Sequence, residues 1–256
     1  MRIALGIEYD GSHFSGWQTQ EAGVRTVQSC VESALSKVAN HPVSVICAGR
    51  TDRGVHAFAQ VIHADVEVER PMRAWILGAT VNLPKDINVL WAQPVDNEFH
   101  ARFSAKARHY RYVILNRPTR SAIYAKRVSW FCRPLDVEKM REASQYLIGT
   151  HDFSSYRAIN CQAKSPIKTV HYINISQYEQ QIRIDIGANA FLHHMVRNIA
   201  GVLMGIGVGD QPPEWAKSVL EARDRTAGGV TAQPDGLYFC KVDYPEQYQF
   251  PVVPIY

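Results

Sequence analysis

The stretch Val170–Ile186, VHYINISQYEQQIRIDI, contains two runs in which apolar and polar residues alternate. The runs span residues 170–177 and 181–186, and Tyr178-Glu179-Gln180 separates them. Alternation with a period of two is typical of half-buried strands, and two such runs around a short polar connection predict an antiparallel hairpin. A hairpin of this kind favours a sheet that is at least partly antiparallel.

Further strands and helices surround this hairpin. The expected strands are residues 2–9, 43–47, 59–66, 109–116, 128–132 and 237–244. Apolar residues at three- and four-residue steps predict helices over residues 26–39, 73–81, 136–147, 191–206 and 213–222. Thr26 and Asp136 are suitable N-caps for two of these helices. Antiparallel hairpins beside helices predict the α+β class rather than a doubly wound parallel sheet.

The chain divides into two halves of this mixed kind. An N-terminal α+β domain is expected over residues 1–104 and a C-terminal one over residues 105–256. With 256 residues the chain can bury a core without disulfides or metal ions. The five cysteines, Cys30, Cys47, Cys132, Cys161 and Cys240, form no C-x-x-C pair, so neither a disulfide framework nor a zinc site is expected. No apolar run is long enough to span a membrane, and we expect a cytoplasmic protein.

The positive charge is distributed unevenly along the chain. The net charge is only +4, but residues 99–135 contain nine Lys or Arg residues and no Asp or Glu. Aromatic residues such as Phe103, Tyr110 and Trp130 lie among these cations. Clustered cations with aromatics suit a phosphate backbone and unstacked bases, which favours single-stranded or looped RNA. The alternative is a solvated sheet edge protected by basic side chains.

One carboxylate stands out as a candidate for chemistry. Asp52 follows a short expected strand, lies between Gly49 and Gly54, and is flanked by Arg50 and Arg53. Nearby cations keep an Asp ionised, which suits a nucleophile or an electrostatic group rather than a general acid. The alternative is an ordinary turn or helix-cap residue, which is the commoner role for an Asp between glycines. No P-loop is present, so ATP use is not expected.

Several blocks in order along the chain resemble the tRNA pseudouridine synthase A (TruA) family. They are Ile7–Gly11, Ala48–His56, Phe99–Ser104, Tyr110–Tyr112, His151–Phe153, Ala190–Asn198 and Gly236–Tyr238. Together they cover nearly the full length. One departure is Arg53, where the family usually has a small residue, and no role is assigned to it.

The resemblance implies a fold of two related α/β sandwich-like halves. Their mainly antiparallel sheets would be joined into one extended sheet, with helices packed outside and a cleft between the halves. It also implies a homodimer that isomerises uridine to pseudouridine in the tRNA anticodon stem-loop, just 3′ of the anticodon. No cofactor, metal or nucleotide is implied. The alternatives are a non-catalytic tRNA-binding module or chaperone, and a protein whose basic segments only edge a sheet.

The resemblance also implies roles for individual residues. Asp52 would be the nucleophile, Arg50 would occupy the space that the flipped base leaves, and Tyr110 would stack on the target uracil. Arg197 would pair with Asp52, and Leu237 would line the base pocket. The implied RNA-contacting residues are Phe99, His100, Arg102, Phe103, Asn160, Cys161, Gln162 and Lys164.

Overall fold

The structure, a computed structural model, describes residues 1–159 and 161–255. Its internal contacts divide the chain into two units. Unit 1 comprises Met1–Lys106 together with Tyr238–Tyr256, and unit 2 comprises Ala107–Leu237. The first boundary lies two residues from the expected one. The last segment differs, because the structure assigns it to unit 1 rather than to the C-terminal half.

Unit 1 contains a sheet with the strand order β4-β1-β3-β10. β1 (Arg2–Tyr9) pairs antiparallel with both β3 (His56–Asp65) and β4 (Ile87–Val95). β10 (Leu237–Asp243) runs parallel to β3, and the short β2 (Ile46–Cys47) pairs with β3 as well. The pairing of β10 with β3 explains why the C-terminal segment belongs to unit 1. No local sequence pattern encodes a pairing between strands so far apart in the chain.

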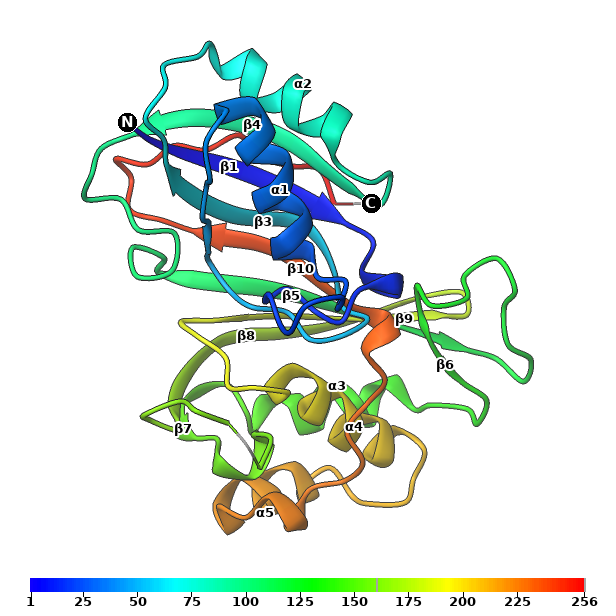
Figure 1. The fold of residues 1–256 in the computed structure, drawn as a ribbon. Coiled ribbons are helices and arrows are strands. Elements are labelled where there is room, and N and C mark those ends of the chain that lie inside the picture. Colours follow the sequence, from blue (N-terminus) through cyan, green and yellow to red (C-terminus); the bar gives the residue numbers. More distant parts are fainter. Residues whose placement is uncertain (160, 256) are drawn as a thin grey trace. The chain divides into compact units, whose positions relative to one another are not determined.

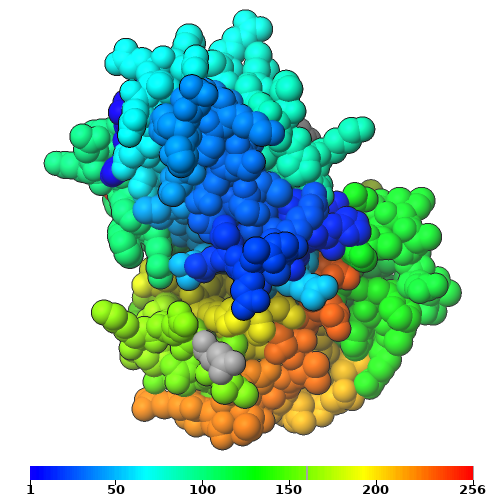
Figure 2. All heavy atoms as spheres, in the orientation of Figure 1, coloured from blue at the N-terminus to red at the C-terminus, as the bar shows by residue number. Residues whose placement is uncertain are grey.

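Two helices cover one face of this sheet. α1 (Val27–Ala39) and α2 (Met72–Asn82) lie side by side in front of the strands (Figure 1), and their side chains largely hide those strands in Figure 2. The side chain of Thr26 accepts a hydrogen bond from the backbone N–H of Ser29, which confirms the predicted N-cap. The apolar side of α1, from Val27 to Ala39, is buried.

The opposite face of the sheet in unit 1 is covered as well. Residues 244–250, here called the C-terminal strap, pass behind the strands in Figure 1. Phe250 stacks on Trp91 of β4, with ring centroids 4.8 Å apart, and Tyr244 and Tyr248 pack against the fully buried ring of Phe99. We call this side the strap face. Because both faces are covered, most of β1 and β3 is buried.

The strands of unit 2 follow the order β5-β9-β8-β7, with antiparallel pairing throughout that order. Its strands are β5 (Ala107–Asn116), β6 (Ser129–Phe131), β7 (Gly149–Asp152), β8 (Ile167–Tyr178) and β9 (Gln181–Ala188). β6 is an added strand that runs parallel to β5. The predicted hairpin is β8–β9, so that prediction is confirmed.

The helices of unit 2 lie on one face of its sheet. α3 (Val137–Gln145) packs against α4 (Met195–Gly207) and β8, while α5 (Trp215–Ala222) packs beside them. Four short 3₁₀ turns complete the elements of the described residues: Gly11–His13, Ser154–Tyr156, Arg225–Ala227 and Pro234–Gly236. Along β8 and β9, buried residues alternate with exposed or half-buried ones. The face turned away from the helices, which carries Asn174, Ser176 and Asp185, is here called the open face.

The α+β class with mainly antiparallel sheets is confirmed, and so is the Asp136 cap of α3. The helix expected from residue 191 was wrong at its start. α4 begins at Met195, because His194 has a φ of 63°, a left-handed conformation that interrupts an α-helix. Strands β4 and β7 were not expected from the sequence. Within the described residues, no helix is long and apolar enough to cross a membrane.

Candidate active site

Asp52 lies on the loop that joins β2 to β3, and buried groups of β3 hold the first part of this loop. The backbone N–H of Ala48 donates to the carbonyl of Val61 at 2.8 Å. The side-chain amide of Gln60, which is fully buried, donates to the carbonyl of Gly49 at 2.6 Å and accepts from its N–H. A buried amide with both functions satisfied fixes a backbone strongly, since leaving either function unpaired is costly.

The segment after β1 holds the same loop from its other side. The hydroxyls of Tyr9 and Thr51 are 2.7 Å apart, and Thr51 also accepts a hydrogen bond at its carbonyl from the N–H of Trp17. Gly16 has a φ of 101°, and a Cβ there would lie 2.9 Å from the Thr51 carbonyl oxygen. Gly16 therefore combines a conformation that glycine adopts easily with a close approach to the loop.

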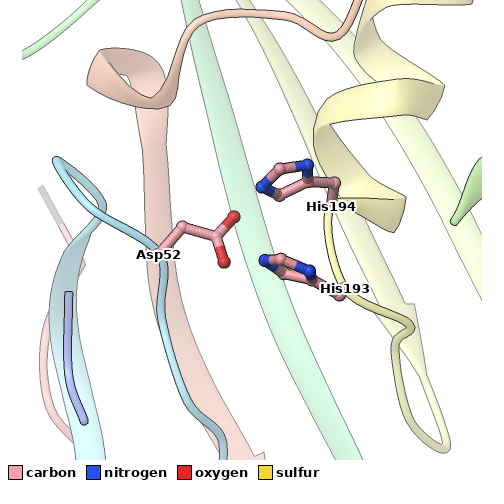
Figure 3. A group of neighbouring side chains, drawn as sticks. All are labelled: Asp52, His193 and His194. Carbon is pink, nitrogen blue, oxygen red and sulfur yellow. The ribbon is translucent and has the colours of Figure 1, made fainter. Parts of the chain in front are cut away.

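The side chains of the loop differ in exposure. Thr51 is buried, Asp52 is half-buried, and Arg50 and Arg53 are both exposed. Figure 3 shows the carboxylate of Asp52 projecting from this loop. A fixed backbone carries an accessible carboxylate, as a preorganised nucleophile or electrostatic group requires. Nothing in the structure explains the presence of Arg53, which is exposed, where the family usually has a small residue.

His56 is a buried polar residue at the end of the loop that sequence reasoning missed. Its Nδ1 accepts a hydrogen bond from the N–H of Gly11 at 3.0 Å, and its ring stacks on Tyr238 with centroids 4.7 Å apart. A Cβ on Gly11 would lie 1.9 Å from the carbonyl oxygen of Val55. His56 and Gly11 therefore lock the start of β3 to the segment after β1. The sequence signal was that two histidines and a glutamine, His56, His63 and Gln60, lie among the mainly apolar residues of this strand.

The remaining candidate catalytic residues belong to unit 2. Tyr110 on β5 is largely buried, and its ring meets the edge of Phe191 at a centroid distance of 5.1 Å. Leu237, at the start of β10, is also buried. The hydroxyl of the neighbouring Tyr112 donates to the carbonyl of Gln233 at 2.8 Å, which ties the segment before Leu237 to β5.

Arg197 lies on the first turn of α4 and is half-buried. Its Nε donates to the carbonyl of Ala232 at 2.8 Å, and Ala232 donates back from its N–H to the carbonyl of Arg197. The guanidinium of Arg225 supports the same segment through hydrogen bonds to Asn198 and Thr231. This network fixes the orientation of the Arg197 stem, and sequence reasoning did not find Arg225 or Asn198.

His193 and His194 lie on the turn that leads into α4 (Figure 3), not on the helix itself as expected. Their ring centroids are 4.0 Å apart. Two imidazoles supply fewer ligands than the three or four protein ligands of a zinc site. This pair alone therefore does not make a metal site within unit 2.

The residues expected to contact RNA lie in two segments. In unit 2, Gln162 and Lys164 are exposed and Cys161 is half-buried, while Asn160 lies outside the described residues. In unit 1, Arg102 and Phe103 are exposed and His100 is half-buried. Phe99 is fully buried, so its side chain stabilises the strap face and has no surface with which to contact a base.

Comparison with known proteins identifies the family. A sequence model of the family described as tRNA pseudouridine synthase matches residues 6–104 and 143–245. The chain belongs to this family. The tRNA pseudouridine synthase A of Nitrosococcus oceani is 62% identical over 251 residues, covering 98% of this chain and 96% of that protein. The enzymes of the same name from Pseudomonas aeruginosa and Alcanivorax borkumensis are 62% and 57% identical, over 98% and 99% of this chain and 88% and 95% of theirs.

Membership confirms the resemblance that the ordered sequence blocks suggested. The candidate residues of this family member divide between the two units. Asp52 and Arg50 lie on one loop of unit 1, with the segment from His100 to Phe103 elsewhere in that unit. Tyr110, Arg197 and Leu237 lie in unit 2. Within each unit the backbone that carries these side chains is held by buried or part-buried hydrogen bonds.

Proposed function

We propose that this member of the tRNA pseudouridine synthase family isomerises uridines in the tRNA anticodon stem-loop, just 3′ of the anticodon, with Asp52 as the group that acts on the sugar. The observation that carries the proposal is the half-buried Asp52 carboxylate on a loop fixed by Gln60 and Tyr9. Relatives that share this chain's full length at 62% identity support the substrate class.

The reaction is an isomerisation and is balanced without a cofactor. The bond between N1 of uracil and C1′ of the ribose breaks, the base rotates, and a bond from C5 to C1′ forms while the proton on C5 leaves. A carboxylate can attack C1′ as in retaining glycosidases, or assist a glycal route. Asp52 can serve either route, since both need a carboxylate beside the sugar.

The base must leave its stack before the carboxylate can reach the sugar, and this costs a few kcal/mol. We infer that Arg50 occupies the vacated space and that Tyr110 stacks on the flipped uracil. Leu237 would line the pocket, and Arg197 would pair with Asp52. The edge contact between Tyr110 and Phe191, and the hydrogen bond from Arg197 to Ala232, support these roles because they fix both side chains.

The test of the proposal measures tritium release from tRNA labelled at C5 of uridine. The wild-type protein releases tritium, and Asp52→Ala and Asp52→Asn fall by at least about a thousandfold, since removing a nucleophile eliminates most of the rate enhancement. Both variants still bind the stem-loop, because losing a negative charge does not weaken attraction to phosphates. Asp210→Asn, which removes a half-exposed carboxylate that pairs with Arg133 in unit 2, is the matched control and stays active.

Two outcomes would contradict the proposal. Tritium release that persists in Asp52→Ala would refute the role of Asp52. A wild-type protein that binds tRNA stem-loops and releases no tritium would instead support a non-catalytic tRNA-binding module. We further propose that the protein acts in the cytoplasm and that it is a homodimer. Sedimentation velocity of the purified protein tests the oligomeric state.

A further inference from the structure

The segment that follows β1 contacts the turn on which Asp52 lies. The N–H of Val55 donates to the carbonyl of Asp52 at 3.2 Å, so residues 52–55 form a β-turn. Gly54, the third residue of this turn, has a φ of 81°, as a type II turn requires at that position. The N–H of Gly54 donates outward to the carbonyl of Phe14 at 3.3 Å. Phe14 therefore joins the segment after β1 directly to the Asp52 turn.

Two glycines of this segment lie against the same turn. A Cβ on Gly16 would lie 3.2 Å from both the backbone nitrogen of Arg53 and the carbonyl carbon of Asp52. A Cβ on Gly11 would lie 1.9 Å from the carbonyl oxygen of Val55. The two backbones thus pack together with no side chain between them. Because such close packing transmits small shifts, a displacement of the segment would displace the turn.

The segment has little regular structure to hold it in place. Residues 10–26 contain one short 3₁₀ turn before α1 begins. The N–H of Asp10 donates to the carbonyl of Asp86 at 3.0 Å. The N–H of Ser15 donates to the carbonyl of Arg25 at 2.9 Å. Asp86 and Arg25 therefore hold the segment at two points through their backbone carbonyls.

The side chains of the same two residues form an ion pair, here called the clamp. The two terminal nitrogens of Arg25 donate to the two carboxylate oxygens of Asp86 at 2.8 and 2.9 Å. The guanidinium carbon lies 3.9 Å from the centroid of the buried Phe14 ring, and a terminal nitrogen also donates to the carbonyl of His13 at 3.4 Å. A guanidinium that is paired at two atoms and stacked on a ring has a defined orientation. The clamp thus contacts the residue whose carbonyl binds Gly54.

We propose that Arg25 and Asp86 are positioning residues for Asp52, and that they act through Phe14 and the turn of residues 52–55. The inference rests on the proposed function, because it names residues that orient the carboxylate which acts on the sugar. A misplacement of about 1 Å at a reacting group can cost about a hundredfold in rate. A carboxylate on the first residue of a turn shifts when the turn shifts.

The surroundings of the clamp fit this role better than a stabilising or an RNA-binding one. The side chains of Arg25 and Asp86 are 41% and 25% exposed, and ion pairs this accessible contribute little to folding. The carboxylate of Asp86 also compensates the charge of Arg25, which weakens its attraction for a phosphate. The terminal nitrogens of Arg25 already donate to groups of unit 1.

The first experiment breaks the clamp and retains the backbone carbonyls of both residues. Arg25→Gln and Asp86→Asn each lower kcat for tritium release from a C5-labelled anticodon stem-loop by about tenfold, and KM stays within about twofold of wild type. A misoriented carboxylate slows the chemical step without altering the contacts that bind RNA. Asp210→Asn breaks an Arg–Asp pair with the same two hydrogen bonds in unit 2 and is the matched control, with the kcat of wild type.

The second experiment combines Arg25→Gln with Asp86→Asn. Either substitution alone already opens the clamp, so the second one adds no further loss. The double variant therefore keeps the kcat of the single variants, whereas residues that act independently would multiply their losses to about a hundredfold.

The third experiment measures amide hydrogen exchange, which reports the turn without any substrate. In Arg25→Gln the N–H of Gly54 exchanges at least about tenfold faster than in wild type, because the contact with Phe14 opens more often. The N–H of Ala48, which donates to Val61 in the same loop, keeps its wild-type rate. This internal control separates a loosened turn from a loss of stability in the whole unit.

Four results would overturn the inference. An unchanged kcat per folded molecule, with a lower unfolding midpoint, would show that the clamp only stabilises unit 1. A raised KM with an unchanged kcat would place Arg25 in contact with RNA. Multiplied losses in the double variant would separate the two residues. If the wild-type protein releases no tritium, the proposed function fails first, and an unchanged exchange rate at Gly54 in Arg25→Gln then overturns the positioning role independently.

Discussion

The two units contain similar sets of strands and differ in what covers the face of those strands away from the helices. In unit 1, β1 is buried along nearly its whole length, because the helices cover one face and the C-terminal strap covers the other. In unit 2, β8 and β9 alternate between buried and accessible residues, as expected for an antiparallel sheet with one solvated face. The same secondary structure thus makes a covered sheet in one half and a half-open sheet in the other.

The difference shows that side chains on a covered sheet face can fix the conformation of a neighbouring loop. On the strap face of unit 1, the rings of Phe99 and Tyr244 and the imidazole of His63 hold the turn that presents Phe103. On the open face of unit 2, side chains pair with others of the same sheet, as Arg111 does with Asp185. Unit 2 instead braces its loop at residues 228–232 with the guanidinium of Arg225, on the helix side.

The largest expected difference between the two faces concerns stability. Phe99→Ala removes a fully buried ring from beneath the strap and lowers the free energy of unfolding by about 3–5 kcal/mol. Tyr178→Ala removes an exposed ring from the open face and changes it by no more than about 0.5 kcal/mol. Urea unfolding of both variants measures the difference. Equal losses would mean that the strap does not cover this face in solution.

Local interactions explain which parts of the fold the sequence predicts. The β8–β9 hairpin and the caps at Thr26 and Asp136 depend on residues a few positions apart, and all three were predicted. β4 was missed because Pro94 lies within it, and proline argues against a strand. It is tolerated there because β4 is the edge strand of unit 1.

In the candidate site too, the sequence predicts what depends on local residues and misses what depends on distant ones. The glycines and arginines around Asp52, together with the ordered family blocks, predict this loop as the candidate site. It does not identify Gln60, His56 or His63, whose partners are backbone groups of segments distant in sequence. Nor does the sequence reveal that Phe99 is buried while Phe103, four residues later, is exposed, because the rings that pack on Phe99 come from the distant strap and from His63.

The second prediction concerns the loss of stability at low pH. This loss should be smaller than the effect of Phe99→Ala, and we expect it from His63 on the strap face but not from an exposed histidine on the sheet of unit 2. Burial lowers the pKa of His63 to about 4, against about 6.5 in an unfolded chain. Between these values the unfolded chain binds a proton at His63 and the native chain does not. The free energy of unfolding therefore falls as the pH decreases from 6.5, by up to about 2 kcal/mol at pH 5.

His63→Asn keeps an acceptor for the N–H of Ala101 and removes the titration. Urea unfolding of this variant between pH 7.5 and pH 5 should therefore show a shallower loss of stability than the wild type. His171→Asn replaces an exposed histidine of β8 and is the matched control, with the slope of the wild type. A slope unaltered in His63→Asn would mean that His63 is accessible to protons in the native state.

In the smallest of the expected effects, a substitution on the open face costs more stability than the matching substitution on the strap face. Each sheet has an Arg–Asp pair directly opposite in register, Arg2 with Asp65 in unit 1 and Arg111 with Asp185 in unit 2. The Asp65 side chain is 66% exposed, and its arginine also donates to the carbonyls of Asn97 and Phe99. The Asp185 side chain is only 29% exposed, so water and salt screen its pair less.

We therefore expect Asp185→Asn to cost about 0.5–1 kcal/mol and Asp65→Asn only a few tenths, at low salt. Urea unfolding in low salt and in about 1 M NaCl, where the screening length shrinks to about 3 Å, measures both costs and their decrease. A larger cost for Asp65→Asn would mean that the carboxylate itself, and not the two backbone carbonyls, holds Arg2 against the turn. In that case the strap face would depend on an ion pair at its edge, and the turn that carries Phe103 would be as sensitive to salt as the open face.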